Sequence, residues 1–386
     1  MLDKAFSGGK NYWGLVVFWF AIILAGMWAY AIQLSEGLIV TGLSRDVPWG
    51  FYISQFTFLV GVAASAVMVV LPYYLHHYKA FGRMVILGEF LAVSAVLMCM
   101  LFIFVDMGQP MRVLNVVLHP TLNSVMFWDM TVLFGYLILN LVIGWMTFDA
   151  ERKGGEPPKW IKPLIYLSIP WAVSIHTVTA FLYSGLEARS FWMTAILAPR
   201  FLASAFASGP SLLIILALIL RKFTTFDVGS EAIQKLAVIV TYAIAINVFF
   251  VAVELFTGLY SNIPHHLQHF EYLFLGLHGK GALVPWIWTS QTLIALALVL
   301  MLFPGIRKNE VLLAIICPAI IIGIWIEKGM GLIVTGFIPS PLESITEYAP
   351  TGIELTIALG VYAIGFLVLT VLYRIVVNVR EGLNPS

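Results

Sequence analysis

Ten long apolar runs, almost free of charged residues, constrain this chain more than any other feature. Most of them match the roughly 20 residues that a helix needs to cross a bilayer. Barrel strands would instead alternate apolar and polar residues over about ten positions. The pattern therefore predicts an all-α, polytopic integral membrane protein with ten transmembrane helices. The expected spans are Trp13–Leu34, Phe51–Leu75, Met84–Val105, Val125–Thr147, Leu164–Leu186, Phe201–Leu220, Leu236–Phe256, Val284–Phe303, Val311–Ile326 and Ile353–Tyr373.

The composition supports the same class of protein. Apolar and aromatic residues make up 61% of the 386 residues, charged residues only 11%, and the mean hydropathy is +0.95. Because a soluble domain carries about 25% charged residues, this chain cannot cover a water-facing surface. Soluble enzymes, nucleic-acid binders and disulfide scaffolds are excluded, and membrane lipid is the expected surrounding. The segment before Trp13 leads into a full-length span, which favours a first helix over a cleavable signal.

The basic residues predict how the chain is oriented. Cytoplasmic loops of membrane proteins collect Lys and Arg. Ten spans place both termini on one side, and fifteen of the 21 basic residues fall there, against six on the other side. We therefore expect cytoplasmic termini in a multi-pass protein of the cytoplasmic (inner) membrane. The longest outer loops either dock a partner or simply cap the helices: 35–50, 106–124, 187–200 and 257–283.

The whole chain, 1–386, is expected to form a single membrane domain with three parts. These parts are a first four-helix bundle at 13–147, a second four-helix bundle at 164–303, and an additional helix pair at 311–373. This division follows the order of the spans along the chain.

A six-residue repeat accompanies two of the outward-going spans. Gly37–Gly42 and Gly331–Gly336 both read GLIVTG, and they follow Glu36 and Glu327 respectively. Internal duplication and chance identity both explain such a repeat. Glycines at these places let the backbone unwind where it is buried in protein or lines a cavity. The short ninth run, which contains a proline, either ends before Glu327 or continues past it into the second copy.

Five ionisable residues lie within the predicted spans: Glu89, Asp129, His176, Glu254 and Glu354. A charge at the bilayer centre is costly, so such residues usually face a protein interior and often mark a pathway. The direction of each span places four of them in the outer half and Glu89 alone near the inner face. Either these groups satisfy one another and hold kinks, or at least one of them is functional.

Polar stripes on three helices favour the functional interpretation. Residues at i, i+7 and i+11 lie on one face of a helix, and residues at i and i+7 do so too. The stripes predict an interior pocket that opens to the outer side. They consist of His176, Tyr183 and Glu187, of Asp129, Tyr136 and Asn140, and of Asn247 and Glu254.

Cofactor ligands are scarce in the sequence. A haem between helices commonly takes two histidines at membrane depth, and only His176 lies there. Two cysteines, Cys99 and Cys317, cannot supply the four ligands of an iron–sulfur cluster. The three histidines between 265 and 269 could bind a metal, although loop histidines are more often surface or interface residues. We therefore expect no haem, no cluster and no metal in this chain, and any redox role would use a diffusible quinone.

Quinone chemistry requires polar groups at the head of an apolar slot, because two electrons and two protons are exchanged. His176, with its near-neutral reference pKa, is the expected partner of a quinone oxygen, assisted by Tyr183. Trp128 would pack on the ring, and Arg189 and Glu187 would line the mouth. The candidates for proton transfer are Asp129, Glu254, Glu89 and Asp106.

The junction between the third and fourth spans carries a recognisable pattern. It reads Asp106-Met-Gly-Gln-Pro-Met-Arg112, followed by His119-Pro120, Asn123-Ser124 and Trp128-Asp129. This pattern resembles the NrfD/polysulfide-reductase family of membrane subunits. Further stretches resemble its ten-helix branch, which contains the hydrogenase-2 membrane subunit and the DsrP-type subunits of the sulfite-reductase-associated complex. These stretches are 176–180, 183–185, 198–209, 278–286 and the region from 327 to 354.

The resemblance implies a haem-free subunit, active only within a complex, that exchanges electrons between menaquinone or ubiquinone and an extracytoplasmic iron–sulfur protein. For DsrP-type subunits, which act in sulfur metabolism, the implied partners are a ferredoxin-like protein and a multihaem cytochrome c outside. The other implied partners are a haem b membrane subunit and a cytoplasmic iron–sulfur subunit. Eight-helix members can place quinone ligands on their first helix; here that helix offers only Tyr30 and Gln33, so those ligands are not transferred.

Two other functions fit the same features. A secondary transporter also has broken helices, internal repeats and buried charges, but its site lies near the midplane, whereas these charges gather toward one face. A purely structural anchor would tolerate changes at Asp129, His176 and Glu254 without loss of turnover.

Overall fold

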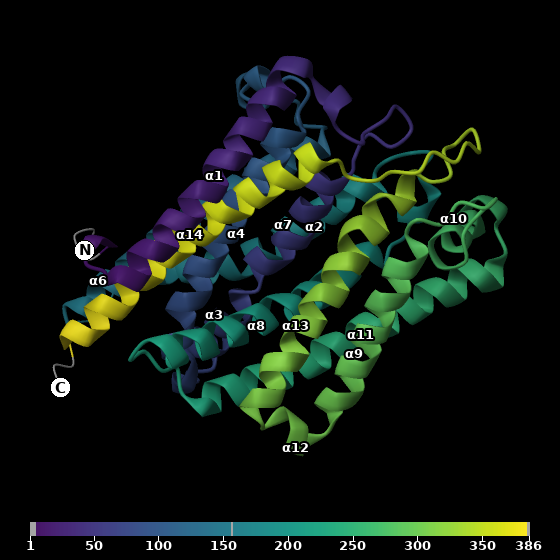
Figure 1. Ribbon diagram of the computed structural model, residues 1–386. Helices are drawn as coiled ribbons and strands as arrows, with labels where there is room; N and C mark the ends of the chain where they lie inside the picture. The colour runs from purple at the N-terminus through teal and green to yellow at the C-terminus, as the bar shows by residue number, and fades with distance from the viewer. Residues whose placement is uncertain (1–4, 156, 384–386) are drawn as a thin grey trace.

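The computed structural model describes residues 5–155 and 157–383, which form helices joined by loops and contain no strand. Ten of its helical segments are long and apolar enough to cross a membrane, which confirms the predicted class and number of spans (Figure 1). The helices are α1 (Lys10–Glu36), α2 (Phe51–Ala64), α3 (Val67–Leu75), α4 (Gly82–Asp106), α5 (Asn115–Leu118), α6 (Val125–Arg152), α7 (Ile161–Ser184), α8 (Leu197–Phe223), α9 (Ser230–Ser261), α10 (Pro264–Phe274), α11 (Val284–Leu302), α12 (Pro304–Arg307), α13 (Glu310–Ile326) and α14 (Gly352–Leu383).

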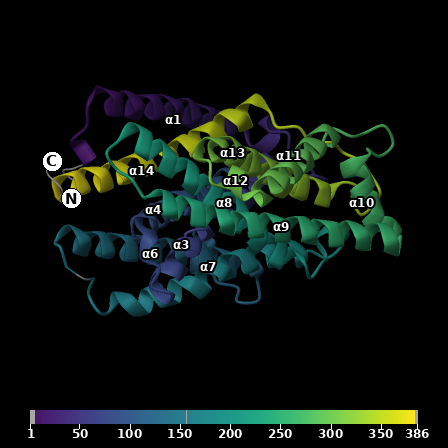
Figure 2. The same cartoon turned by 90° about the horizontal axis from the view of Figure 1, so that it is seen from below.

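The packing contacts group these helices into two bundles and a peripheral pair. Helices α2, α4, α6 and α7 form the first bundle, and α8, α9, α11 and α13 form the second, which meets the first through α8. Helix α1 packs along α14, and α14 also contacts α4. Figure 2 shows α1 and α14 together along one edge of the molecule. This grouping differs from the division expected at 13–147, 164–303 and 311–373, because the first and last spans pair with each other.

A glycine contact explains why α1 pairs with α14. A Cβ atom added to Gly26 would lie 2.6 Å from the Cα of Gly360, and one added to Gly360 would lie 2.8 Å from the Cα of Gly26. Small residues at a crossing let two helix backbones approach closely in a membrane, where dispersion contacts drive association. The two glycines are 334 positions apart in the sequence, so the order of the spans gives no sign of this contact.

Replacing Gly26 by leucine is therefore expected to separate α1 from α14 and to destabilise the protein by about 1–3 kcal/mol, the range for overpacking. Gly14 lies on the same helix, and nothing is within 4 Å of the Cβ that it would gain, so Gly14→Leu is the matched control. Thermal unfolding in detergent gives the melting temperature of each variant. Equal melting temperatures for the two variants would contradict this account of the contact.

The two ends of the molecule are distinct. The start of α1 and the end of α14 lie at one end, which we call the terminal face, and α10 lies at the other, which we call the α10 face (Figure 1). The long loops 35–50, 106–124 and 187–200 also belong to the α10 face. Helix α10 was not predicted, since it is short and polar and lies within the loop expected at 257–283.

The ninth span is a broken helix that continues past Glu327. Helix α13 leads into a π-helical turn at Glu327–Gly331, in which Gly329 has the non-helical angles φ −81° and ψ −109°. The chain then proceeds to a 3-10 turn at Thr335–Phe337, so the whole span covers Glu310–Phe337. The second GLIVTG copy is buried inside this span, whereas the first forms a partly exposed 3-10 turn after α1. The two copies thus adopt different structures.

Candidate functional site

The polar stripe on α7 lies in the core of the first bundle. His176, Thr179 and Tyr183 are all fully buried. The Thr179 hydroxyl donates a hydrogen bond of 2.6 Å to the Asp129 carboxylate on α6. The Tyr183 hydroxyl lies 2.5 Å from the Thr57 hydroxyl on α2. The structure therefore brings together three of the residues singled out from the sequence, and it joins α2, α6 and α7 through them.

His176 is the least satisfied group of this stripe. Its side chain is 0% exposed, and neither ring nitrogen has a hydrogen-bond partner. Buried polar groups in proteins are nearly always hydrogen-bonded, and an exception calls for an explanation such as a ligand or an ordered water. Lys328, on the broken span, is the charged group that acts on the imidazole electrostatically. His176 is thus available to a polar ligand or a proton.

An aromatic cluster covers this stripe on the side of the α10 face. The ring of Trp49 lies 5.8 Å from that of Tyr183 and 6.2 Å from that of Trp192, with which it stacks. The ring of Phe337 lies 5.0 Å from Trp192. The Arg189 guanidinium sits 4.5 Å above the Phe337 ring, and partial burial lowers the pKa of Arg189. Arg189 therefore caps an aromatic layer that ends at Tyr183.

This aromatic layer also depends on the second GLIVTG copy. The indole nitrogen of Trp192 donates a 3.0 Å hydrogen bond to the carbonyl of Leu332. A Cβ atom on Gly336 would lie 2.0 Å from the Trp192 ring, so only glycine lets the indole approach. The repeat's last glycine therefore has a packing role in this copy.

The other predicted site residues lie apart from His176. Trp128 is 46% exposed and donates to the carbonyl of Leu122. Glu187 is exposed in the loop after α7. Two further predicted acids lie on α4: Asp106 ends that helix at the α10 face, and Glu89 lies in its half nearer the terminal face, buried, with neither carboxylate oxygen hydrogen-bonded.

Glu354 has a structural environment. Its carboxylate accepts hydrogen bonds from the backbone nitrogens of Gly42 at 2.7 Å and Thr351 at 2.8 Å, and from the Tyr348 hydroxyl at 2.6 Å. A carboxylate with three donors at a helix N-terminus is well satisfied. Glu354 therefore fastens the loop after α1 to the start of α14.

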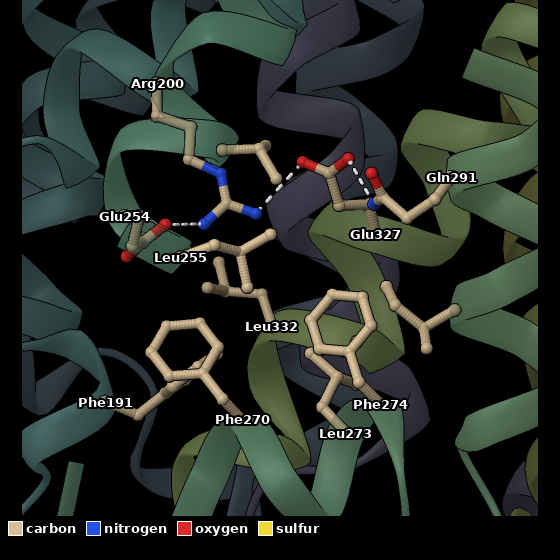
Figure 3. Close-up of a pocket in the computed structure, with 13 residues that line it drawn as sticks. Phe191, Arg200, Glu254, Leu255, Phe270, Leu273, Phe274, Gln291, Glu327 and Leu332 are labelled. Atoms are coloured by element: carbon tan, nitrogen blue, oxygen red, sulfur yellow. Dashed lines mark hydrogen bonds and ion pairs between the residues drawn. The ribbon is translucent and has the colours of Figure 1, made fainter. Parts of the chain in front are cut away.

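A second polar centre lies in the second bundle, and of its charged residues the sequence patterns singled out only Glu254 as a candidate. The Arg200 guanidinium forms ion pairs with Glu254 and, at 3.0 Å, with Glu327. Gln291 donates a 3.1 Å hydrogen bond to the other oxygen of Glu327. Figure 3 shows the guanidinium between the two carboxylates, above a wall of aromatic and aliphatic side chains. The wall includes Phe191, Phe270, Leu273 and Phe274.

Glu254 reaches toward the α10 face from this centre. It borders a small cavity of about 20 Å³, room for one water, together with Arg200 and Glu327. It also borders a larger cavity of about 300 Å³ whose other walls include Thr257 and His266. Glu254 therefore borders both a water-sized cavity and a larger one.

Lys328 connects the two centres. Its ammonium donates to the carbonyl of Phe201 at 3.3 Å and lies 4.4 Å above the Phe201 ring. It interacts electrostatically with His176 in the first bundle and with Arg200 in the second. Both bundles converge at the break at Glu327–Gly331. Because π-helical turns are frequent at functional sites, this break belongs to the candidate site.

An apolar slot of about 230 Å³ lies between α2, α4, α13 and α14. At one part of its wall, the Trp325 indole and the Tyr362 hydroxyl donate to the side-chain oxygen of Gln55 at 2.6 and 2.7 Å. The amide nitrogen of Gln55 is buried and has no acceptor. The slot therefore adjoins a free hydrogen-bond donor. The remaining wall is formed by Phe58, Leu59, Val62, Leu91, Ser94, Met98, Leu212, Ile321, Ile322, Phe366 and Leu369.

The histidines on α10 hold outer segments together. The Nδ1 atom of His269 lies 2.9 Å from the carbonyl of Thr335 and 2.8 Å from that of Ile338, and burial lowers the pKa of His269. His266 similarly contacts the carbonyl of Ser190 at 3.1 Å. Within residues 5–155 and 157–383, no group of three or more His, Cys, Asp or Glu side chains is arranged to hold a metal.

Two helical bundles that share a broken span, with buried polar centres in both, define a polytopic membrane protein built around an interior site. The chain belongs to the family described as polysulphide reductase, NrfD, whose model matches residues 39–338. This membership confirms the resemblance seen at the junction of the third and fourth spans.

Its relatives are membrane subunits of reductase and oxidoreductase complexes. The chain is 25% identical to a Halobacterium salinarum protein provisionally named as a dimethyl sulfoxide reductase membrane subunit, over 93% of this chain and 89% of that protein. It is 23% identical to a selenate reductase subunit of Mesobacillus selenatarsenatis, over 92% of each. It is 24% identical to the Hdr-like menaquinol oxidoreductase integral membrane subunit of Archaeoglobus fulgidus, over 68% of this chain and 65% of that protein.

Proposed function

We propose that this chain is the quinone-interacting membrane subunit of a respiratory electron-transfer complex. It exchanges electrons between the quinone pool and an iron–sulfur partner docked on the α10 face, which is the extracytoplasmic side by the distribution of basic residues. The observation that carries the proposal is His176, a fully buried imidazole with both nitrogens unpartnered beneath the aromatic layer. The Archaeoglobus relative is named for menaquinol, which favours menaquinone as the quinone here.

Within this proposal each polar group has its own role. His176 accepts or donates the proton at one quinone oxygen, and Tyr183, two helical turns away on the same face, positions the head together with Thr57. Asp129 exchanges protons with the stripe through Thr179, to which it is hydrogen-bonded. Glu254, which borders the 300 Å³ cavity, serves as a proton exit on the second bundle. The other proposed contributors are Arg189 and Glu187 at the mouth, Asp106 near the α10 face, and Glu89 toward the terminal face. Trp128 is left out of this site, because it is 46% exposed, whereas His176 is fully buried.

The slot beside Gln55 is a second candidate position for the headgroup, favoured by the unpartnered amide nitrogen. Filling the slot discriminates between the two positions. With the headgroup at His176, Val62→Phe is expected to leave the KM for quinol unchanged, because the larger ring occupies space that the headgroup does not use. Val62→Ile, which leaves the slot open, is the control. A large rise in KM for Val62→Phe alone would move the headgroup to Gln55.

Exposed apolar side chains on the loop after α4 suit a docking partner. Met111 is 89% exposed, and Leu114, Leu118 and Leu122 are also exposed on the same loop. An iron–sulfur protein bound there would lie close to Asp106 and to the α10 face of the first bundle. The finer proposal is a DsrP-type complex linked to sulfite reduction. Its partners would be a ferredoxin-like protein, a multihaem cytochrome c, a haem b membrane subunit and a cytoplasmic iron–sulfur subunit.

Co-purification tests this assignment directly. An iron–sulfur protein recovered with the full chain supports the electron-transfer role, and a multihaem cytochrome beside it supports the DsrP-type complex. Substrate-dependent uptake by the purified chain alone in liposomes would instead support a secondary transporter.

A further inference from the structure

A basic pocket of about 240 Å³ lies near the terminal face, remote from both polar centres. It is bounded by Lys235 on α9, by Arg307 and Lys308 at the end of α12, and by Tyr78 in the turn after α3. The remaining wall is formed by Glu231, Gln234 and Val238. Its lining therefore combines three cationic side chains with one carboxylate.

The charges of this pocket are free to bind an anion. The single carboxylate, Glu231, already accepts a 2.7 Å hydrogen bond from the Tyr78 hydroxyl. Lys235 and Lys308 form no ion pair among the described residues. One nitrogen of Arg307 donates to the carbonyl of Met301 at 3.0 Å, which holds the guanidinium in place and leaves its other donors available. The pocket thus presents a net positive charge on a partly fixed frame.

A separate apolar slot of about 380 Å³ is lined by residues further along the same face of α9. Lys235 and Val238 line the pocket, whereas Ile239, Tyr242 and Ile246 line the slot. These positions follow the spacing i, i+3, i+4, i+7 and i+11, which defines one helix face. The opposite walls of the slot come from α3 and α8: Met68, Pro199, Leu202, Ala203 and Phe206.

The dimensions match one leaflet of a membrane. Lys235 lies in the second turn of α9, near the level expected for lipid phosphates. From Lys235 to Ile246 the helix rises about 16 Å, and half of the hydrocarbon core is about 15 Å thick. A cationic pocket at the interface and an apolar slot, which together extend about as far as one leaflet, have the shape of a phospholipid.

We propose that this pocket and slot bind an anionic phospholipid. Its phosphodiester accepts hydrogen bonds from Lys235, Arg307 and Lys308, and one acyl chain lies in the slot along α9. Basic pockets between transmembrane helices recognise such headgroups, and arginine suits phosphate because its donors are arranged as a planar fork. The slot distinguishes a lipid from free phosphate, since free phosphate has nothing to place there. The site would fasten α3, α9 and α12, which belong to different parts of the fold.

The test compares lipid binding by the full chain in detergent, using phosphatidylglycerol, phosphatidylcholine and inorganic phosphate as probes. Native mass spectrometry and thermal unfolding give the occupancy and the stabilisation. We expect phosphatidylglycerol to bind and stabilise the protein, and the other two probes to do neither. The variant Lys235→Gln/Arg307→Gln/Lys308→Gln is expected to weaken phosphatidylglycerol binding about 100-fold, since each basic residue near the surface contributes about fivefold.

Two further variants keep the proposal falsifiable. Lys159→Gln/Lys162→Gln/Lys222→Gln removes three lysines from other places near the terminal face and is expected to bind like the wild type. Ala243→Phe, which fills the slot and leaves the cations in place, is expected to weaken phosphatidylglycerol binding as well. Equal loss in the lysine control would show a general surface effect, and stabilisation by inorganic phosphate would show an anion site without a lipid. Either result overturns the proposal, as does unchanged binding by the triple pocket variant.

Discussion

Replacing His176 by alanine is expected to lower quinone-linked turnover by about two orders of magnitude or more, the usual contribution of a positioned acid or base. The imidazole is fully buried and its nitrogens bond to nothing in the protein. Its removal therefore breaks no internal hydrogen bond, and the loss should fall on the reaction rather than on folding. Turnover is measured in the assembled complex with a quinol as donor.

Thr177 provides the matched control for this variant. It is the next residue on α7, it is only partly buried, and its hydroxyl bonds only to the carbonyl of Val173, so Thr177→Ala should retain full turnover. Recovery of the partner subunits with both variants shows that the complex assembles. Wild-type rates for His176→Ala would remove His176 from the site and would leave the Gln55 slot as the candidate.

The first-bundle centre could be predicted from the sequence because its signal is local. The i, i+7 spacing placed His176 and Tyr183 on one face of α7, and the structure has both in the core. The same reasoning predicts that Asp129 faces the interior, since a polar stripe on one helix needs a polar partner on another. Trp128, its neighbour in the sequence, points instead to the surface, because adjacent residues on a helix face different directions.

Of the charged residues in the second-bundle centre, the search for uncharged runs finds only Glu254, because it alone lies inside a predicted span. Arg200, Glu327 and Lys328 each stand at a point where such a run stops, so the hydropathy pattern places them in loops or at span ends. In the structure they lie inside the spans 197–223 and 310–337. Their charges compensate one another across three helices. A hydropathy plot averages over neighbouring residues, so it cannot show an opposite charge that lies more than 50 residues away in the sequence. The available signal was the apolar stretch that resumes after Lys328.

The Arg200 cluster gives the second large prediction, which concerns stability. Formally, Arg200 and Lys328 carry two positive charges and Glu254 and Glu327 two negative ones, so the cluster is balanced. Arg200→Leu leaves one carboxylate in excess inside the membrane. Breaking a buried pair by removing one partner typically costs about 3–5 kcal/mol. We expect this variant to unfold at a markedly lower temperature in detergent, or to fail to accumulate in the membrane.

A compensating change separates charge balance from lost packing. In Arg200→Leu/Glu254→Gln the remaining pair, Lys328 and Glu327, is balanced again, so most of the lost stability should return. Arg152→Leu is the control for removing an arginine, because Arg152 pairs with Asp149 at an exposed position, where an ion pair contributes about 0–1 kcal/mol. A double variant no more stable than Arg200→Leu would show that the guanidinium acts through its own contacts. Recovery of stability in the double variant would show that the broken span tolerates its buried charges because they sum to zero.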